Sequence, residues 1–126
     1  MIIARSRVFE VLNIKMHNVI ETINGPVLIA FKNINGEMYL DLWLDRYEDF
    51  DIWYLFKVDT DNFERYTSKK TTLRKLIKSA EYGFWRTTTR NREEISATMI
   101  SLEDFPKRYM PKRKSYHVQD YVRDED

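Results

Sequence analysis

Cysteine is absent from the 126 residues of this chain, which excludes disulfide bonds, thiolate zinc sites and a cysteine nucleophile. Glycine is scarce: it stands at positions 25, 36 and 83, and no GxGxxG or Walker-type loop is present. Because phosphate-binding loops depend on closely spaced glycines, a backbone cradle for nucleotide phosphates is not expected. We therefore expect no cofactor.

Long apolar runs are missing as well. No window approaches the roughly 18 uncharged apolar residues that a membrane helix requires. Residues 1–7 also lack the basic-then-apolar order of a secretory signal. We therefore expect a cytoplasmic protein that does not act at a membrane.

Aromatic residues are abundant, with three Trp, eight Tyr and seven Phe, which is typical of a packed domain rather than of a linker. The length fits one domain that buries its core without metal or disulfides. We predict a single α+β domain over residues 1–116 and an acidic, disordered tail over residues 117–126. The segment Lys107–Tyr116 interleaves aromatic and charged residues. It is either an interaction tail or a strap that packs Tyr109 and Met110 onto the core, and we favour the strap.

Strand patterns dominate both ends of the domain. Runs rich in β-branched and aromatic residues predict strands over 8–15, 26–33, 37–45, 52–58, 84–89 and 95–101. Residues 16–23 fit either a continuing strand or a short helix. Turns are predicted at residues 24–26, at Asn35-Gly36, in a polar loop over 46–51, and at 91–94. The Asn-Gly pair favours a type I′ hairpin turn, in which both central residues take positive φ.

The strand over 37–45 shows the clearest alternation of the chain. Its core face is predicted to carry Met38, Leu40, Leu42 and Leu44. The opposite face is predicted to carry Tyr39, Asp41, Trp43 and Asp45.

Helices are expected between residues 61 and 83. Asp61, with Glu64 three residues later, matches the capping box of a short helix that ends before Ser68. Thr71 or Thr72 caps a clearer helix that Gly83 ends. Its buried stripe is predicted to be Leu73, Leu76, Ile77 and Ala80.

The order of these elements is strands, then helices, then strands, without regular βαβ alternation. We therefore predict an α+β fold with a mostly antiparallel sheet of about five or six strands and one or two helices packed on one face. A short helical turn is expected after Ser101, stopped by Pro106.

Net charge is only +1, but the charges are segregated along the chain. Residues 37–64 hold nine acidic residues against two basic ones, and residues 65–92 hold nine basic residues against one acidic one. The basic stretch includes Lys69, Lys70, Arg74, Lys75, Lys78, Arg86, Arg90 and Arg92. Basic residues bind phosphates, and the neighbouring Phe84 and Trp85 offer stacking surfaces, so this stretch is the candidate for binding RNA or DNA. The simpler interpretation is a solvated helix face followed by an arginine-rich turn.

The sequence gives little support for a catalytic site or a metal site. The acidic loop lacks the alternating ligands and central Gly of a calcium loop, so we interpret it as a solvated hairpin loop and expect no metal site. Its members are Asp45, Glu48, Asp49 and Asp51. Asp41 and Asp45 are spaced so as to share a strand face, and the alternatives are an acid–base pair or an exposed polar face. The two histidines, His17 and His117, fall in no catalytic or zinc-binding pattern.

Three segments together resemble a family of small bacterial and phage proteins of unknown function. They are Gly25-Pro26-Val27-Leu28 with the Asn33–Leu40 segment and Trp43-x-Asp45, then Thr72-Leu73-Arg74 with Ala80-Glu81-x-Gly83, and Ser101-Leu-Glu-Asp-Phe-Pro-x-x-Tyr-Met-Pro. The resemblance spans about residues 8 to 116. It implies a shared fold and carries over no catalytic residue.

Two functions are consistent with these observations. The first is a non-enzymatic protein-binding module, from a phage–host or toxin–antitoxin setting, that uses opposite charge patches at Asp49 and Asp51 and at Lys75 and Lys78. The second is an RNA- or DNA-binding protein, or a small ribonuclease-type toxin, that uses the basic stretch over 69–92.

Overall fold

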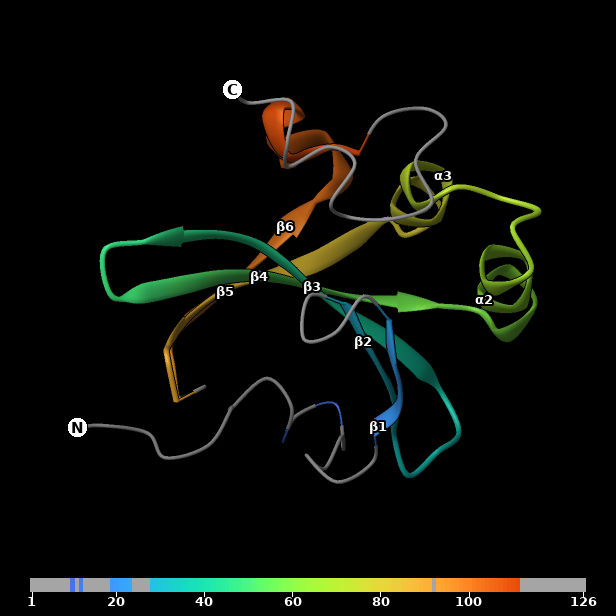
Figure 1. Ribbon diagram of the computed structural model, residues 1–126, viewed down its shortest axis with the longest axis horizontal. Coiled ribbons are helices and arrows are strands. Elements are labelled where there is room, and N and C mark those ends of the chain that lie inside the picture. Colours follow the sequence, from blue (N-terminus) through green and yellow to red (C-terminus); the bar gives the residue numbers. More distant parts are fainter. Residues whose placement is uncertain (1–9, 11, 13–18, 24–27, 92, 112–126) are drawn as a thin grey trace.

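The structure, a computed structural model of the chain, describes residues 10, 12, 19–23, 28–91 and 93–111 (Figure 1). Within these residues, six strands form one sheet in the order β1-β2-β3-β4-β5-β6, and every neighbouring pair is antiparallel. The strands are β1 (Val19–Ile23), β2 (Leu28–Lys32), β3 (Met38–Tyr47), β4 (Phe50–Val58), β5 (Tyr82–Thr89) and β6 (Glu94–Ser101). The predicted α+β fold and its antiparallel sheet are therefore confirmed.

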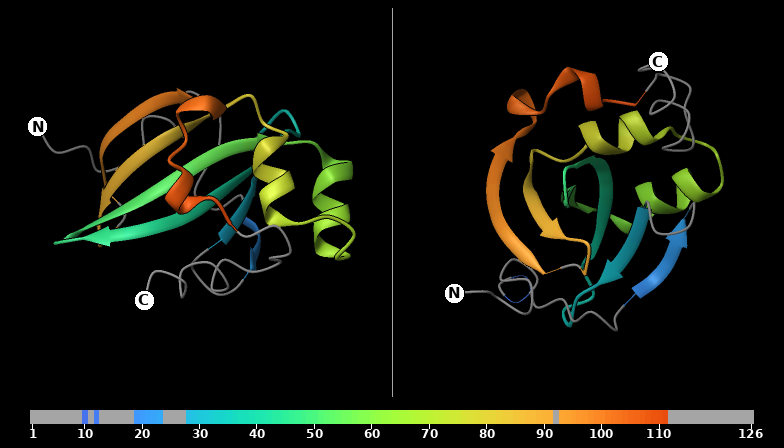
Figure 2. Two further views of the ribbon diagram at one scale, coloured as in Figure 1. Left: turned by 90° about the horizontal axis from the view of Figure 1, so that it is seen from above. Right: turned by 60° about the vertical axis from the view of Figure 1, so that its left-hand side comes forward.

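Among the described residues, two α-helices lie in the connection between β4 and β5. They are α2 (Thr60–Thr67) and α3 (Leu73–Lys78), and two 3-10 turns follow β6, η2 (Leu102–Asp104) and η3 (Lys107–Tyr109). Figure 2 shows these four helical segments gathered on one side of a curved sheet. In the described part of the chain, no helix has the length and apolar character needed to cross a bilayer.

The helix-covered face of the sheet carries the main core. The predicted alternation of β3 is confirmed, because Met38, Leu40, Leu42 and Leu44 are all buried there. The rest of this core comes from facing strand residues and from the helices: Leu28, Ala30, Tyr54, Phe56, Val58, Phe63, Tyr66, Leu73, Leu76, Ile77, Ala80, Phe105 and Tyr109. The apolar stripe predicted for α3 therefore contacts the sheet as expected. The predicted strap is also confirmed as far as residue 111, since Tyr109 is buried and Met110 packs against the core.

The opposite face holds a smaller apolar cluster. It consists of Ile29, Phe31, Tyr39, Trp53 and Leu55, with Leu12, Trp43, Phe84 and Ala97 packed against it. Strand β2 is buried on both faces, since Leu28, Ile29, Ala30 and Phe31 are all buried.

The turn between β2 and β3 is a hairpin, but its predicted type is wrong. Gly36 has φ +82°, whereas Asn35 does not have positive φ, so the type I′ geometry is absent. The amide of Gly36 donates to the Asn33 carbonyl at 3.0 Å, and the amide of Asn33 donates to the Glu37 carbonyl at 2.9 Å. These bonds describe a three-residue loop closed by a left-handed glycine. The Asn33 side chain stabilises this three-residue loop, because its Oδ1 accepts hydrogen bonds from the amides of Asn35 and Glu37 at 3.0 and 2.8 Å.

Two further predictions about local structure, a loop and a helix cap, are corrected. The polar loop over 46–51 shrinks to a two-residue turn, Glu48-Asp49, because Arg46 and Asp51 pair across β3 and β4. The cap of α2 is Asp59 rather than Asp61, and its Oδ1 accepts the Asn62 amide at 2.7 Å.

Of the two predicted caps for α3, Thr72 is the one that caps it, and the helix ends at Lys78 with Ser79 as its C-cap residue. Gly83 does not end it and lies inside β5. Glycine is required there for space, because a Cβ at this position would lie 2.4 Å from Tyr54 Cζ.

Most of the predictions for the N-terminal part of the chain fall on residues that the structure does not describe. Of the strand predicted over 8–15, only two residues are described, and they are helical (Glu10) and in a turn (Leu12) rather than extended. Residues 19–23 form a strand, so the strand alternative holds for that part of the ambiguous 16–23 segment. The turn predicted at 24–26 and the tail predicted at 117–126 lie outside the described residues.

Candidate functional site

The predicted basic stretch does not form one surface. Lys69 and Lys70 are exposed in the loop between α2 and α3, and Lys75 and Lys78 are exposed on α3. Arg74 is half-buried, and its Nη1 donates to the Pro111 carbonyl at 3.2 Å, which ties the strap to the helix.

The arginines of β5 and its turn separate from these lysines. Arg86 is buried on the opposite face of the sheet, where its Nη1 donates to both carboxylate oxygens of Asp41 at 2.9 Å. Its Nε donates to Glu94 Oε1 at 3.1 Å. Arg90 is exposed in the β5–β6 turn, and Arg92 lies outside the described residues. The interpretation of Arg86 as part of a phosphate-binding surface is therefore corrected: it is an internal ion-pair residue.

The two carboxylates considered as an acid–base pair lie on opposite faces of the sheet. Asp41 contacts Arg86, whereas Asp45 accepts the Tyr109 hydroxyl at 2.7 Å on the helix-covered face. A β-bulge between Trp43 and Asp45 causes this separation, because the extra residue, Leu44, reverses the alternation. Neither the acid–base pair nor the exposed polar face describes Asp41, which is buried and ion-paired.

The described residues do not bring the other catalytic and metal-binding candidates together. No group of three or more His, Asp or Glu side chains is placed there to hold a metal ion. His17 and His117 lie outside the described residues.

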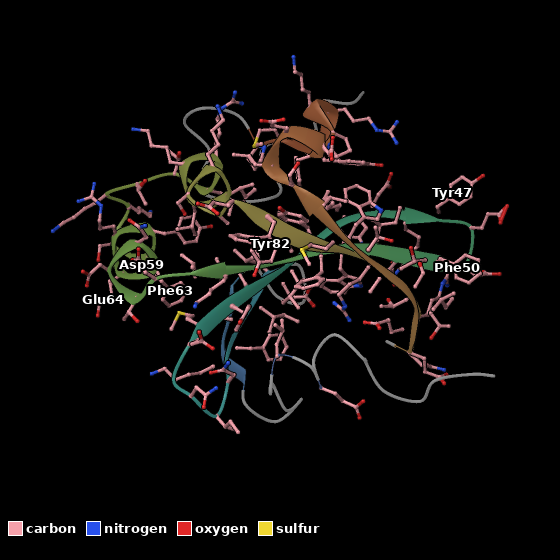
Figure 3. All side chains as sticks on the ribbon, turned by 180° about the vertical axis from the view of Figure 1, so that it is seen from behind. Tyr47, Phe50, Asp59, Phe63, Glu64 and Tyr82 are labelled. Carbon is pink, nitrogen blue, oxygen red and sulfur yellow. The ribbon has the colours of Figure 1, made fainter. Side chains whose placement is uncertain are left out.

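A distinct surface is formed by the end of the β3–β4 hairpin, which we call the hairpin tip: Tyr47, Glu48, Asp49 and Phe50. Tyr47 is 66% exposed, Glu48 and Asp49 are exposed, and Phe50 is half-buried. Figure 3 shows Tyr47 and Phe50 together at one end of the molecule, with α2 at the other end. Within the described chain, neither Glu48 nor Asp49 forms an ion pair. The tip therefore presents aromatic surface together with two carboxylates that form no ion pair in the described chain.

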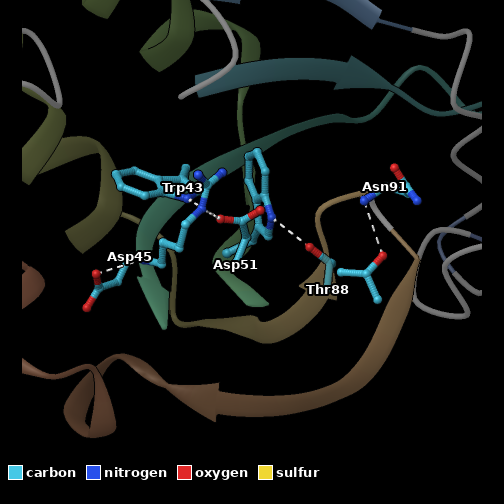
Figure 4. A network of polar contacts seen from close by, with 8 residues as sticks. Trp43, Asp45, Asp51, Thr88 and Asn91 are labelled. Atoms are coloured by element: carbon cyan, nitrogen blue, oxygen red, sulfur yellow. Dashed lines mark hydrogen bonds and ion pairs between the residues drawn. The ribbon is translucent and has the colours of Figure 1, made fainter. Parts of the chain in front are cut away.

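A polar network directly behind the tip fixes its geometry (Figure 4). Asp51 Oδ1 accepts both the Trp43 indole N–H at 3.1 Å and the Arg46 Nε–H at 2.9 Å. Asp51 is buried, so the prediction that it lies in a solvated loop is wrong. The hydrogen bond to Asp51 raises the pKa of Arg46, so the guanidinium stays charged. One carboxylate thus ties both strands of the hairpin together.

The strap supports the same hairpin from the helix-covered face. Tyr109 donates to Asp45 and accepts a hydrogen bond from Arg108 Nη2 at 2.9 Å. Burial raises the pKa of Tyr109, and so does the hydrogen bond to Asp45, so the phenol stays neutral. Arg108 also lies over the ring, with its Cζ 4.7 Å from the centroid.

The β2–β3 turn provides a contrast with the hairpin tip. Ile34 is 65% exposed there, but the nearby Glu37 is paired with Lys57 at 2.6 Å. The hydrogen bonds from Lys57 and Asn33 lower the pKa of Glu37. This turn therefore exposes one apolar side chain without a free carboxylate.

Sequence reasoning found Glu48 and Asp49 as acidic residues but missed Tyr47 and Phe50. The signal was available in part: two aromatic residues flank the two-residue turn. It was obscured because the surrounding charges suggested a longer loop, whereas the strand pairing continues through Arg46 and Asp51 to Tyr47 and Phe50.

Comparison with known proteins identifies a family but no activity. A family model described as a family of unknown function (DUF6575) matches residues 9–118. No curated protein matches the chain, and no solved structure matches it.

Proposed function

The chain belongs to DUF6575, a family of unknown function, and from its own geometry we propose that it is a non-enzymatic protein-binding module that recognises its partner with the hairpin tip. The observation that carries the proposal is the exposed Tyr47 beside two exposed carboxylates that have no ion-pair partner in the described chain.

The tip has the two properties that recognition surfaces combine. An exposed aromatic ring supplies much contact area with few rotatable bonds, and such residues dominate the binding energy of interfaces. The network of Trp43, Arg46 and Asp51 holds the hairpin in place before binding, which reduces the entropy lost on association.

The chemistry of the tip indicates the chemistry of the partner. Glu48 and Asp49 favour a basic surface, since complementary charge steers encounter and excludes wrong partners. Tyr47 requires an apolar pocket within that surface. Of the four residues predicted for protein binding, the proposal retains Asp49. It drops Asp51, which is buried, and it drops Lys75 and Lys78, which lie on α3, away from the tip (Figure 1).

Binding of RNA or DNA, including a ribonuclease-type toxin, is the alternative. It keeps support from four exposed lysines: Lys69, Lys70, Lys75 and Lys78. It predicts binding whose logarithm falls linearly with the logarithm of salt concentration. A flat salt response, or no binding at low salt, would remove it.

The biological setting is part of the proposal. A role in phage–host conflict or in a toxin–antitoxin pair is supported by the resemblance of the sequence motifs to small bacterial and phage proteins. Identifying the partner tests this setting directly.

The experiment is a quantitative capture of proteins from native-host lysate by the tagged chain, with and without nuclease. Wild type is compared with Tyr47→Ser and Asp49→Lys. The matched control is Ile34→Ser, because Ile34 is as exposed as Tyr47 but lies on the other turn. Lys75→Glu is the control for charge.

We expect a nuclease-resistant, stoichiometric partner whose affinity falls by roughly 30-fold in Tyr47→Ser, the effect of losing a residue that dominates an interface. Both controls should bind like wild type. Equal capture by Tyr47→Ser and Ile34→Ser would refute the proposal. Loss in Lys75→Glu together with nuclease sensitivity would favour the nucleic-acid alternative.

A further inference from the structure

Strand β6 forms one edge of the sheet. It is the last strand in the sheet order, and no described strand pairs with its outer side. Natural edge strands are usually protected by lysine, proline or short length. β6 has eight residues, none of them Lys or Pro, and its residues 95–101 carry no charge. Its bulge lies near its start, opposite Thr87 and Thr88, so Ser96–Ser101 remain regular.

Apolar side chains concentrate beside this edge. Met99 is 59% exposed and Ile95 is 50% exposed on β6, and Tyr82 is 49% exposed on β5. Met99 lies opposite Phe84, whose ring meets Tyr82 edge-on at 6.1 Å. Among the described residues, three of the five exposed large hydrophobic side chains are therefore next to the open edge.

The exposed charged residues next to the two ends of β6 differ in sign. Arg90 is exposed in the turn before the strand, and it forms no ion pair within the described chain. Its neighbour Glu93 is half-buried, and Glu94 is committed to Arg86. After the strand, Glu103 and Asp104 are exposed in η2.

We propose that β6 pairs with β6 of a second copy of this chain, in antiparallel orientation, to form one sheet that continues across a two-fold axis. Antiparallel pairing places Arg90 of each copy beside Glu103 and Asp104 of the other, and the symmetry makes this contact twice. Parallel pairing would place like charges together. The backbone of the open edge supplies the hydrogen bonds, and Met99 and Ile95 supply apolar contact. The proposal does not depend on the hairpin tip, because β5 separates β6 from the β3–β4 hairpin.

The test is the molar mass of the full chain, measured by sedimentation velocity and light scattering over a concentration series. We expect wild type to approach twice its 15.3 kDa mass as concentration rises. Met99→Lys should be monomeric, because it places a charge beside the pairing edge. Arg90→Glu should weaken the dimer by about tenfold, and Arg90→Glu with Glu103→Lys and Asp104→Lys should restore it, because charge complementarity is regained.

Three controls separate the outcomes. Ile34→Lys places the same charge on an equally exposed apolar site away from β6 and should leave the dimer intact. Far-UV circular dichroism shows whether each variant is folded. Where a variant is unfolded, the concentration dependence of the wild-type Tm serves as a second test of dimer formation. Tyr47→Ser should dimerise like wild type, so failure of the dimer and failure of the hairpin tip are read separately.

A wild-type chain that stays monomeric at about 1 mM, where even weak specific contacts form, would overturn the proposal. It would also be overturned by a dimer that survives Met99→Lys, or by a charge reversal that the charge swap does not rescue. If wild type is monomeric and Met99→Lys loses a lysate protein that Tyr47→Ser retains, the edge belongs to a different chain.

Discussion

The two faces of the sheet are stabilised in different ways. The helix-covered face is a continuous apolar core whose buried side chains come from β2, β3, β4, the two helices and the strap. The opposite face has a small apolar cluster interrupted by charge, because Arg86, Asp41 and Glu94 are buried together within it. A polar contact also joins Trp53 on this face to β5, since its indole N–H donates to the side-chain hydroxyl of Thr88 at 3.1 Å.

This difference separates stability from specificity. Apolar burial is non-directional, so the helix-covered face stabilises many similar packings about equally well. The ion-paired face accepts only the register in which Arg86 of β5 reaches Asp41 of β3 across β4, because a buried charge without its partner is strongly destabilising. We infer that the apolar face supplies most of the folding free energy and that the ion-paired face fixes the alignment of β3, β4 and β5.

The largest expected effect comes from breaking the ion-paired face. Arg86→Ala removes the cation that Asp41 and Glu94 share, and removal of one partner from a buried ion pair destabilises a protein by about 3–5 kcal/mol. The measurement is urea unfolding followed by circular dichroism.

The control for Arg86→Ala is Lys32→Ala, an exposed basic residue of β2 that should change stability by no more than about 0.5 kcal/mol. Replacing the three charges together by Met at 86 and Leu at 41 and 94 should recover most of the loss, since buried ion pairs are often replaceable by apolar groups. A loss below about 1 kcal/mol in Arg86→Ala would show that the ion pairs do not hold this face together.

The same contrast explains what the sequence could and could not predict. The leucine alternation in β3 and the apolar stripe of α3 were readable, because one period and one residue class define each of them. Arg86 was not readable as an internal residue. Its burial depends on the register between β4 and β5, and two helices lie in that connection, so no turn of fixed length sets the register.

The candidate site could not be predicted from the sequence for a similar reason, because its geometry depends on the register between strands. A single bulge at Leu44 sends Asp45 to the face opposite Asp41, and no local sequence signal marks it. The Arg46–Asp51 pair likewise converts a predicted loop into strand. In both places the deciding contact joins residues on different strands, which single-sequence periodicity does not describe.

A second prediction tests how tightly the apolar face is packed. Gly83→Ala would place a Cβ 2.4 Å from Tyr54 Cζ. The Tyr54 ring is fully buried, stacks on Phe56 at 5.5 Å and meets Phe105 at 4.8 Å, so it has little room to move. Overpacking of this kind destabilises by about 1–3 kcal/mol, measured by urea unfolding.

Gly36→Ala is the matched control for Gly83→Ala. No atom lies within 4 Å of its added Cβ, so its loss of stability comes from the positive φ alone. Adding Tyr54→Val should rescue Gly83→Ala and should not rescue Gly36→Ala, because only the first pair is in contact. Additive losses in Gly83→Ala and Tyr54→Val would contradict the packing argument.

The smallest expected effect on stability at neutral pH concerns the hydroxyl of Tyr54. It is also the effect that tests the contrast between the two faces most sharply. This hydroxyl is the one buried side-chain polar atom in the described chain that lacks a hydrogen-bond partner, and it lies in the apolar face rather than in the polar one. Tyr54→Phe removes this hydroxyl, so stability near pH 7 should stay equal or rise by up to about 1 kcal/mol.

The pH dependence of the same variant gives the stronger test. Burial raises the pKa of Tyr54 to about 12, whereas in the unfolded chain the phenol ionises near its ordinary value of 10. Between these two pH values the unfolded state loses its proton and the folded state keeps it, so stability is complete below pH 10 and falls as the pH rises. Wild type should therefore lose on the order of 2 kcal/mol more than Tyr54→Phe between about pH 8 and 11.5. Tyr47→Phe, an exposed tyrosine, should follow wild type in the same urea titrations. Identical pH profiles for wild type and Tyr54→Phe would mean that water reaches this hydroxyl, and that the helix-covered face is less completely closed than its packing indicates.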